Sequence, residues 1–179
     1  EAAEPTRRGD MTDALREAIL RYAQARADPA GIARTDIPGM TLVRALATGA
    51  LQAAVQRPLI CLVVQGAKQV TLGAQTLTFG AGDSMLLTGD APTLTRIVRA
   101  SPAAPYLSFA LNLDAALIAE LDAEMAPAST QPGPALRFQP TDAEVADTAL
   151  RLVRLLDRPA SVPVLQAQLV REMHHWLLA

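Results

Sequence analysis

Few residues of this chain are of the types that bind metals or perform acid–base and nucleophilic chemistry. Its two histidines, His174 and His175, are neighbours near the C-terminus. Adjacent helical positions point about 100° apart, so the two rings do not chelate one ion as positions i and i+4 could. A closed zinc site needs four suitable ligands, and the chain has one cysteine besides this pair. We therefore expect no metal and no cofactor.

The single cysteine, Cys61, lies in an apolar run at residues 59–65. A reactive thiol needs basic neighbours or a helix N-terminus, which lower its pKa. Neither is visible in the local sequence, although Arg57 and Lys68 could lie near Cys61 in space. The sequence favours a buried core cysteine over a redox or electrophile sensor. A lone cysteine excludes an internal disulfide and fits a reducing, cytoplasmic location.

Several other classes of protein are disfavoured. Residues 66–73 lack the Gly-Lys-Ser/Thr ending of a phosphate-binding loop, and no Gly-x-Ser-x-Gly nucleophile elbow occurs. Half of the 179 residues are hydrophobic, the net charge is -2, and Lys and Arg form no dense cluster. A nucleic-acid-binding surface is therefore not expected. No apolar run approaches the ~20 residues that span a bilayer, so no membrane partner is expected.

Short apolar runs separated by glycine predict an antiparallel barrel or sandwich for the first part of the chain. The Gly73-Ala74 pair is a two-residue hairpin signal. The run 59–65 is apolar almost throughout, which predicts that both of its faces are covered. Residues 50–57 are ambiguous and we interpret them as a loop. The predicted strands are 41–47, 59–65, 68–72, 75–79, 84–88, 93–99 and 106–113.

Apolar residues with helical spacing predict one helix before the strands and three after them. The polar start, residues 1–10, is interpreted as an expression remnant or a disordered end. Small polar residues with three prolines predict a loop at 126–134. The helices are expected at 12–27 with Thr12 as N-cap, at 115–125 with Asp114 as N-cap, at 142–156 after a capping box of Thr141 and Glu144, and at 164–178.

A set of motifs, in order and at these spacings, resembles the N-terminal domain of a branch of AraC-type transcriptional regulators. The resemblance covers roughly residues 34–178. The motifs are Val63-Val64-Gln65-Gly66-Ala67-Lys68-Gln69-Val70-Thr71-Leu72-Gly73, Gly80-x-Gly82, Asp90-Ala91-Pro92, Ala100-Ser101-Pro102-x-x-Pro105-Tyr106-Leu107, and Leu111-Asn112-Leu113-Asp114 leading into Ile118-Ala119-Glu120-Leu121.

This resemblance implies a cupin-like β-barrel that senses a small effector, followed by helices that mediate dimerisation. The expected fold class is mainly β with a helical C-terminal part, α+β overall. Residues 11–113 would form the first helix and the barrel, and residues 114–179 the dimerisation subdomain. In such regulators a C-terminal domain with two helix-turn-helix motifs binds DNA. We expect that this domain is absent here, that the chain is a fragment, and that DNA is a partner only through the missing domain.

The effector would bind between the sheets, among side chains from alternate strand positions. Which strand face points inward is a guess, because a shift of one residue exchanges the two faces. An arginine pointing inward would suit an anionic effector. Two alternatives stay open: a dimerisation module without ligand, and a metal-independent cupin enzyme, although the predicted strands contain no His or Glu. The effector candidates are Cys61, Val63, Met85, Leu87, Tyr106 and Arg96.

The chain ends in the apolar cluster Trp176-Leu177-Leu178, and exposed apolar clusters of this kind mark contact surfaces in soluble proteins. These side chains would pair with their copies across a two-fold axis or pack on the missing DNA-binding domain. We favour the dimer, with the last helix at the axis. The interface candidates are Leu165, Leu169, Met173 and Trp176. The sequence as a whole thus predicts an effector-sensing, dimerising regulatory domain and not an enzyme.

Overall fold

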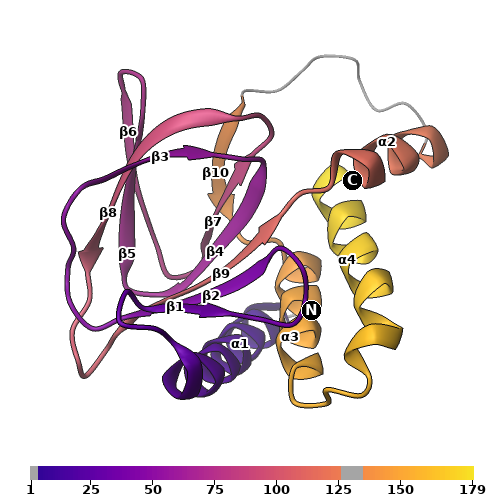
Figure 1. The fold of residues 1–179 in the computed structure, drawn as a ribbon, viewed down its shortest axis with the longest axis horizontal. Helices are drawn as coiled ribbons and strands as arrows, with labels where there is room; N and C mark the ends of the chain where they lie inside the picture. Colours follow the sequence, from indigo (N-terminus) through magenta and orange to yellow (C-terminus); the bar gives the residue numbers. More distant parts are fainter. Residues whose placement is uncertain (1–3, 126–134) are drawn as a thin grey trace.

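The structure is a computed structural model, which describes residues 4–125 and 135–179. In this part of the chain, most of the strands come before most of the helices (Figure 1). In order they are α1 (Glu4–Arg26), β1 (Ile32–Arg34), β2 (Met40–Ala45), β3 (Gln52–Gln56), β4 (Leu59–Gln65), β5 (Ala67–Leu72), β6 (Gln75–Gly80), β7 (Asp83–Leu87), β8 (Ala91–Arg99), β9 (Tyr106–Asn112), α2 (Ala115–Glu124), β10 (Leu136–Pro140), α3 (Ala143–Leu155) and α4 (Val162–Leu178).

The strands form two antiparallel sheets that face each other. One sheet has six strands in the order β1-β2-β9-β4-β7-β10, and the other has four in the order β3-β8-β5-β6. One core cluster lies between the sheets, and a second lies where helices α1, α3 and α4 cover the other face of the six-stranded sheet. In Figure 1 the strands gather on one side and α3 and α4 on the other. The expected cupin-like barrel with a C-terminal helical part is confirmed.

Strand β4 shows why its sequence is apolar on both faces. Successive side chains of a strand point to opposite sides of the sheet. Ile60 and Leu62 belong to the helix-side cluster, whereas Cys61 and Val63 belong to the cluster between the sheets. Both faces of β4 are therefore covered, as the sequence predicted.

Helix α3 packs between α1 and α4 and shares the helix-side core cluster with the six-stranded sheet. Most of its apolar side chains are buried, Leu152 and Ala149 fully. Its N-cap is Asp142, whose carboxylate accepts hydrogen bonds from the N–H groups of Glu144 and Val145. The predicted cap at Thr141 is wrong by one residue, because either side chain can cap a helix and the carboxylate occupies this position. The predicted cap of α2 at Asp114 is confirmed.

Four elements differ from the prediction, and the first is strand β1, which pairs with β2 and was not predicted. Helix α1 begins at Glu4 instead of after Thr12, so residues from the polar start are helical. Residues 50–57, interpreted as a loop, contain β3, which forms an edge strand on β8. Strand β10, which carries Phe138, pairs with β7 and was not predicted. Pairing with a neighbouring strand, a tertiary interaction, stabilises these short segments, whose own sequences are weak β signals.

The remaining predicted strands and the helix α4 lie within a few residues of their expected bounds. Gly73, at the turn between β5 and β6, has a φ of 59°, as the hairpin signal requires. The loop predicted at 126–134 lies outside the described residues. None of the helices in the described part of the chain is long and apolar enough to cross a membrane.

Candidate functional site

Five of the residues predicted to bind an effector share the core cluster between the sheets. They come from three neighbouring strands of the six-stranded sheet, β4, β7 and β9. The register pairs Cys61 with Met85 and with Ala110, so side chains from the three strands meet at one level. The cluster contains Cys61, Val63, Met85, Leu87 and Tyr106, together with Val70, Phe79 and other apolar residues.

The hydroxyl of Tyr106 is the most unusual polar group of this interior. Tyr106 is 1% exposed, and its hydroxyl oxygen meets no hydrogen-bond partner. The Ser108 hydroxyl and the Cys61 thiol are near enough to affect it, but burial is the main reason that the pKa of Tyr106 lies well above its usual value. A buried hydroxyl without a partner costs free energy. Such a group is therefore available to a ligand that enters between the sheets.

The half-buried Lys68 adds a positive charge on the inner face of the four-stranded sheet, and sequence reasoning did not assign it to the site. On β5 it pairs with Phe79 and Ile97, both of which contact the cluster between the sheets. Gln69, the next residue, bonds to an exposed side chain on the outer face, so alternation places Lys68 on the inner face. Among the described residues its ammonium group forms neither a hydrogen bond nor an ion pair. Its alternation with Val70, visible in the sequence, was the signal that could have identified it.

Cys61 is buried in this environment. Burial raises the pKa of its thiol, while the charge of Lys68 and the nearby Ser108 and Tyr106 hydroxyls act in the opposite direction with smaller effects. The thiol is therefore protonated near neutral pH, as in a core cysteine. Lys68 is thus near Cys61, as the sequence analysis allowed, but it does not make the thiol reactive.

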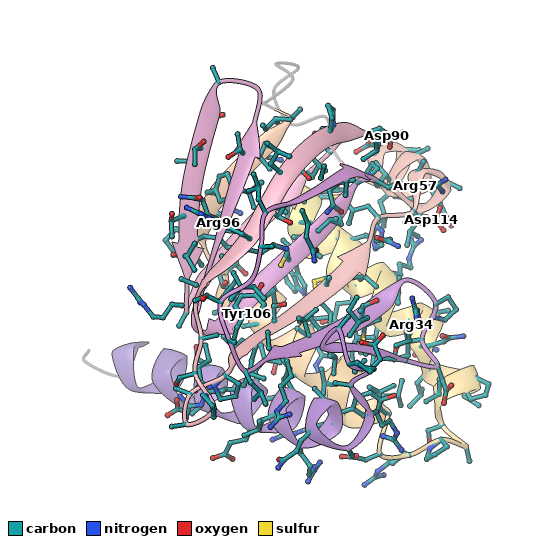
Figure 2. The ribbon with its side chains drawn as sticks, turned by 60° about the vertical axis from the view of Figure 1, so that its left-hand side comes forward. Arg34, Arg57, Asp90, Arg96, Tyr106 and Asp114 are labelled. Atoms are coloured by element: carbon teal, nitrogen blue, oxygen red, sulfur yellow. The ribbon has the colours of Figure 1, made fainter. Side chains whose placement is uncertain are left out.

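Arg96 does not belong to this group, and its assignment to the effector site is wrong. It is exposed, and its Nε donates a hydrogen bond to Oε1 of Gln69 at 3.0 Å. On β8 the buried positions are Thr93 and Thr95, so alternation turns Arg96 to the outer face of the four-stranded sheet. Figure 2 shows both positions, with Tyr106 in the middle of the strands and Arg96 at the side of the four-stranded sheet.

A separate cavity of about 390 Å³ lies along the edge strand β3, over β8 and the end of β5. It is lined mainly by apolar and small side chains, including Val55 and Leu94, which are both exposed. None of its lining residues belongs to either core cluster or to the predicted effector site. The cavity is therefore a second location where a small molecule could bind.

The predicted interface residues of α4 do not share one surface. Leu165 is 40% exposed, and the neighbouring Val164 is 70% exposed. Leu169 and Trp176 are half-buried and pack against the helix-side core, and Met173 is fully buried in it. Met173 therefore cannot contact a partner, and its assignment to an interface is wrong. The helical spacing of the apolar residues in α4 was predicted correctly. The apolar stripe that they form, however, faces α3 within the same chain and not a partner.

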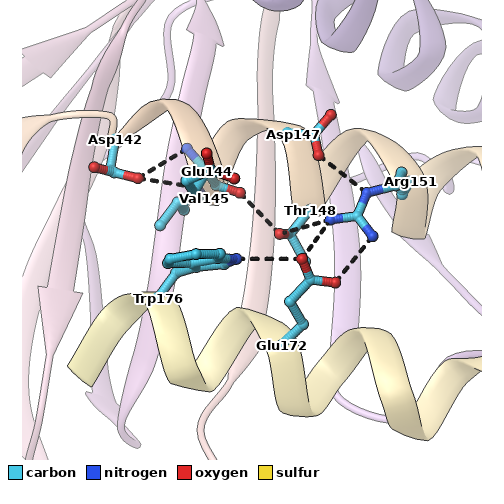
Figure 3. A network of polar contacts seen from close by, with 8 residues as sticks. All are labelled: Asp142, Glu144, Val145, Asp147, Thr148, Arg151, Glu172 and Trp176. Carbon is cyan, nitrogen blue, oxygen red and sulfur yellow. Dashed lines mark hydrogen bonds and ion pairs between the residues drawn. The ribbon is translucent and has the colours of Figure 1, made fainter. Parts of the chain in front are cut away.

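A network of ion pairs and hydrogen bonds connects α4 with α3 beside this apolar stripe (Figure 3). The Arg151 guanidinium binds Oε1 of Glu172 at 2.7 Å and Oδ2 of Asp147 at 3.1 Å, and Trp176 Nε1 donates to Glu172. The hydrogen bond with Glu172 raises the pKa of Arg151, and the same bond lowers that of Glu172. Both groups remain charged near neutral pH, and they set the orientation of α4 against α3.

The described residues contain no group of three or more His, Cys, Asp or Glu side chains that could hold a metal ion. His174 and His175 are not a chelating pair. His174 is buried and hydrogen-bonded through its ring, whereas His175 contacts the ring of Trp176. The barrel interior instead combines an apolar lining with a few uncharged polar groups and one ammonium. These are the kinds of group that would suit a small molecule with an apolar body and a polar or anionic end.

Comparisons with known proteins agree with this fold. A family model described as AraC-type transcriptional regulator N-terminus matches residues 36–179. An apo structure of ToxT from Vibrio cholerae covers 80% of this chain and 56% of its own, with a TM-score of 0.57 and 8% identity. Wild-type ToxT with bound unsaturated fatty acid covers 78% of this chain and 50% of its own, with a TM-score of 0.50 and 10% identity.

A cupin-2 domain containing protein from Shewanella frigidimarina covers 41% of this chain and 69% of its own, with a TM-score of 0.30 and 12% identity. Sequence comparison with curated proteins returned no match. The chain spans about half the length of the two ToxT chains.

Proposed function

Because the chain belongs to the family of AraC-type transcriptional regulator N-termini, we propose that it senses a small effector between its two sheets and controls DNA binding by a domain outside this chain. The effector would bind one arrangement of the barrel and helices better than another, and so shift their populations. In this proposal the chain acts as a regulatory domain of a bacterial cytoplasmic regulator and not as an enzyme.

The observation that carries this proposal is the unpaired Tyr106 hydroxyl inside the apolar barrel. Cores rarely keep a buried polar group without a partner, and a bound ligand would supply the missing hydrogen bond. The unpaired Lys68 ammonium on the same inner face supports an effector with an anionic end. Cys61, Val63, Met85 and Leu87 would line the apolar part of the site.

The structure of ToxT with bound unsaturated fatty acid suggests the first probe, a fatty acid such as palmitoleate. A ligand at 100 times its Kd stabilises the folded state by ~2.7 kcal/mol. For a chain of this size, that stabilisation corresponds to an increase in Tm of about 5–10 °C. We expect palmitoleate, or an apolar carboxylate from a wider screen, to give a shift of this order in a thermal unfolding assay.

Val63→Trp should abolish this shift. Val63 is buried between the sheets, and an indole there would occupy the space that an effector needs, at a cost of about 1–3 kcal/mol for overpacking. Lys68→Met keeps the apolar stem but removes the charge. It should weaken the binding of a carboxylate effector by about tenfold, or ~1.4 kcal/mol. The measurement is the ligand-induced change in Tm of each variant, relative to its own unliganded Tm.

Val55→Trp is the matched control. It places the same side chain on the exposed strand β3, in the cavity along the sheet edge, and should leave the shift unchanged. A normal shift in Val63→Trp together with a lost shift in Val55→Trp would move the site to that cavity and contradict the proposal.

We further propose that the chain forms a dimer through the exposed part of α4, where Val164 and Leu165 face solvent. A regulator that reads two half-sites requires such two-fold pairing. Leu165→Glu should convert a dimer at tens of micromolar into a monomer, because a carboxylate in an apolar interface costs several kcal/mol, as is usual for an unpaired buried charge. Sedimentation equilibrium measures the mass.

Gln168→Glu, on an exposed position of the same helix, is the control and should remain a dimer. A wild-type chain that sediments as a monomer would reject the dimer. It would favour the alternative that this surface packs on the DNA-binding domain. A dimer in which neither Val63→Trp nor the effector screen has any effect would instead support a dimerisation module without ligand.

A further inference from the structure

Strand β3 is an open edge of the four-stranded sheet. It pairs with β8, and its other side faces no strand among the described residues. Thr93 Oγ1 donates a hydrogen bond to the carbonyl oxygen of Ala54 at 3.4 Å, so this carbonyl group points toward β8. Successive residues of an antiparallel strand direct their backbone groups to opposite sides. The N–H and C=O groups of Ala53 and Val55 therefore point away from the sheet, where another strand can bind them.

The other edges of the two sheets carry features that hinder such pairing. Strand β1 ends in Arg34, and β10 contains Arg137 and Pro140. Strand β6, the opposite edge of the four-stranded sheet, also contacts β4 and β7. Strand β3 contains no charged residue and no proline, and four of its five residues are exposed. Natural proteins protect edge strands by charge, by proline or by covering them, and none of these devices protects β3 in the described part of the chain.

The sequence of β3 fits a second copy of the same strand. Read in either direction, Gln52-Ala53-Ala54-Val55-Gln56 is almost the same. An antiparallel pair with its two-fold axis at Ala54 places Gln52 opposite Gln56 and Ala53 opposite Val55. Each Ala53–Val55 pair then exchanges two backbone hydrogen bonds, and no charged side chains oppose each other. A two-fold symmetric contact requires this kind of self-complementarity.

The apolar surface beside β3 favours the same partner. Val55 is 73% exposed and Leu94 is 38% exposed. The register pairs Val55 with Pro92 and Ala53 with Leu94, so these side chains share the outer face of the sheet and line the cavity of about 390 Å³. In the pair, Val55 of the second copy lies opposite Ala53 and covers part of this cavity. Burial of apolar surface then adds to the backbone hydrogen bonds.

We propose that β3 pairs antiparallel with β3 of a second copy of this chain, which joins the two four-stranded sheets into one continuous sheet. This contact is separate from the proposed dimer through α4, because α4 packs on the side of the six-stranded sheet (Figure 1). It does not depend on the proposed function. A strand of five residues gives a small interface, so we expect a Kd on the order of 0.1–1 mM for this contact alone.

The test uses the Leu165→Glu chain, in which the proposed contact through α4 is removed. Sedimentation equilibrium of this chain at concentrations up to about 1 mM should show an average mass that rises toward that of a dimer. In proton–nitrogen NMR spectra, the amide resonances of Ala53 and Val55 should move with concentration. The same resonances can be followed in the wild-type chain, so this measurement decides the question even if Leu165→Glu does not fold.

Charges placed at the two-fold axis test the register. Ala54 faces its own copy in the proposed pair, and like charges directly opposite each other destabilise a sheet. Ala54→Lys and Ala54→Glu should each raise the Kd about threefold or more, whereas an equimolar mixture of the two variants should restore pairing. Thr78→Lys is the matched control, because it adds the same charge at an exposed position of β6, the other edge of the sheet. It should leave the Kd unchanged.

A mass that stays monomeric up to about 1 mM would overturn the proposal. So would concentration-dependent shifts that do not include β3, or a mixture of the two charged variants that pairs no better than either variant alone. Movement of the β3 resonances only on addition of an unrelated strand-forming peptide would assign this edge to a foreign partner, and would overturn it as well. A negative effector screen would contradict the proposed function and leave this result intact.

Discussion

Gly66→Ala should lower the free energy of unfolding by about 3 kcal/mol or more, from the left-handed backbone and the steric clash together. Gly66 joins β4 to β5 with a φ of 79°, a region that costs a residue with a Cβ roughly 1–2 kcal/mol. A Cβ built there would lie 2.5 Å from the carbonyl oxygen of Arg99 and 3.0 Å from Cα of Tyr106. Both neighbours are backbone atoms of paired strands, which cannot rotate away as a side-chain end could. Urea unfolding of the wild type and the variant measures the loss.

Gly73→Ala is the control for this effect. Gly73 also has a positive φ, 59°, but a Cβ there would meet nothing within 4 Å. Gly73→Ala should therefore lower the free energy of unfolding by only the roughly 1–2 kcal/mol that the left-handed conformation costs. Equal losses of unfolding free energy in Gly66→Ala and Gly73→Ala would show that the close approach of the backbone at Gly66 contributes nothing. That result would contradict the steric argument for Gly66.

Tyr106→Phe should stabilise the free protein by about 1–3 kcal/mol, the range by which a buried polar group without a partner is penalised. The phenyl ring keeps the packing of the tyrosine and removes only the oxygen that lacks a hydrogen bond. The same change should lower the affinity for an effector that bonds to this oxygen by about tenfold, or ~1.4 kcal/mol. Greater stability with poorer binding is the expected signature of a group kept for function.

Two measurements check this prediction: urea unfolding without ligand, and a titration with the effector identified by thermal shift. Tyr22→Phe is the control, because the Tyr22 hydroxyl bonds to the carbonyl oxygen of Arg34 at 3.3 Å and is exposed. Its loss should change stability by no more than about 1 kcal/mol, and not in the stabilising direction. A destabilised Tyr106→Phe would mean that the hydroxyl has a partner in solution, and the argument for an available polar group would fail.

The barrel was predictable because its strands carry strong local signals. The run 59–65 is apolar at every position that must be covered, and the Gly73-Ala74 pair marks a tight hairpin. Asp114 likewise marks the start of α2 by the chemistry of its side chain. Strands β1, β3 and β10 were missed, because their residues become strands only through pairing with β2, β8 and β7.

The candidate site was predictable only in part. Strand alternation grouped Cys61, Val63 and Tyr106 on one face, and the structure brings these side chains together between the sheets. The same alternation, applied to β8, would have excluded Arg96 had the buried parity of that strand been known. Lys68 alternates with Val70, but this pattern alone does not say which face of the strand points inward. Strand register, which is a tertiary property, decides it.

For the helices that follow the strands, the sequence by itself determined the apolar period and, for α2, the N-cap Asp114, because caps and apolar spacing are local. Only the tertiary structure decided what each apolar stripe faces. Met173 lies on the stripe that was assigned to a partner, but α3 covers it within the same chain. His174 looked like half of a histidine pair and is instead bonded to Asp114, sixty residues away. Such contacts depend on how the elements pack, and no local pattern of residues encodes them.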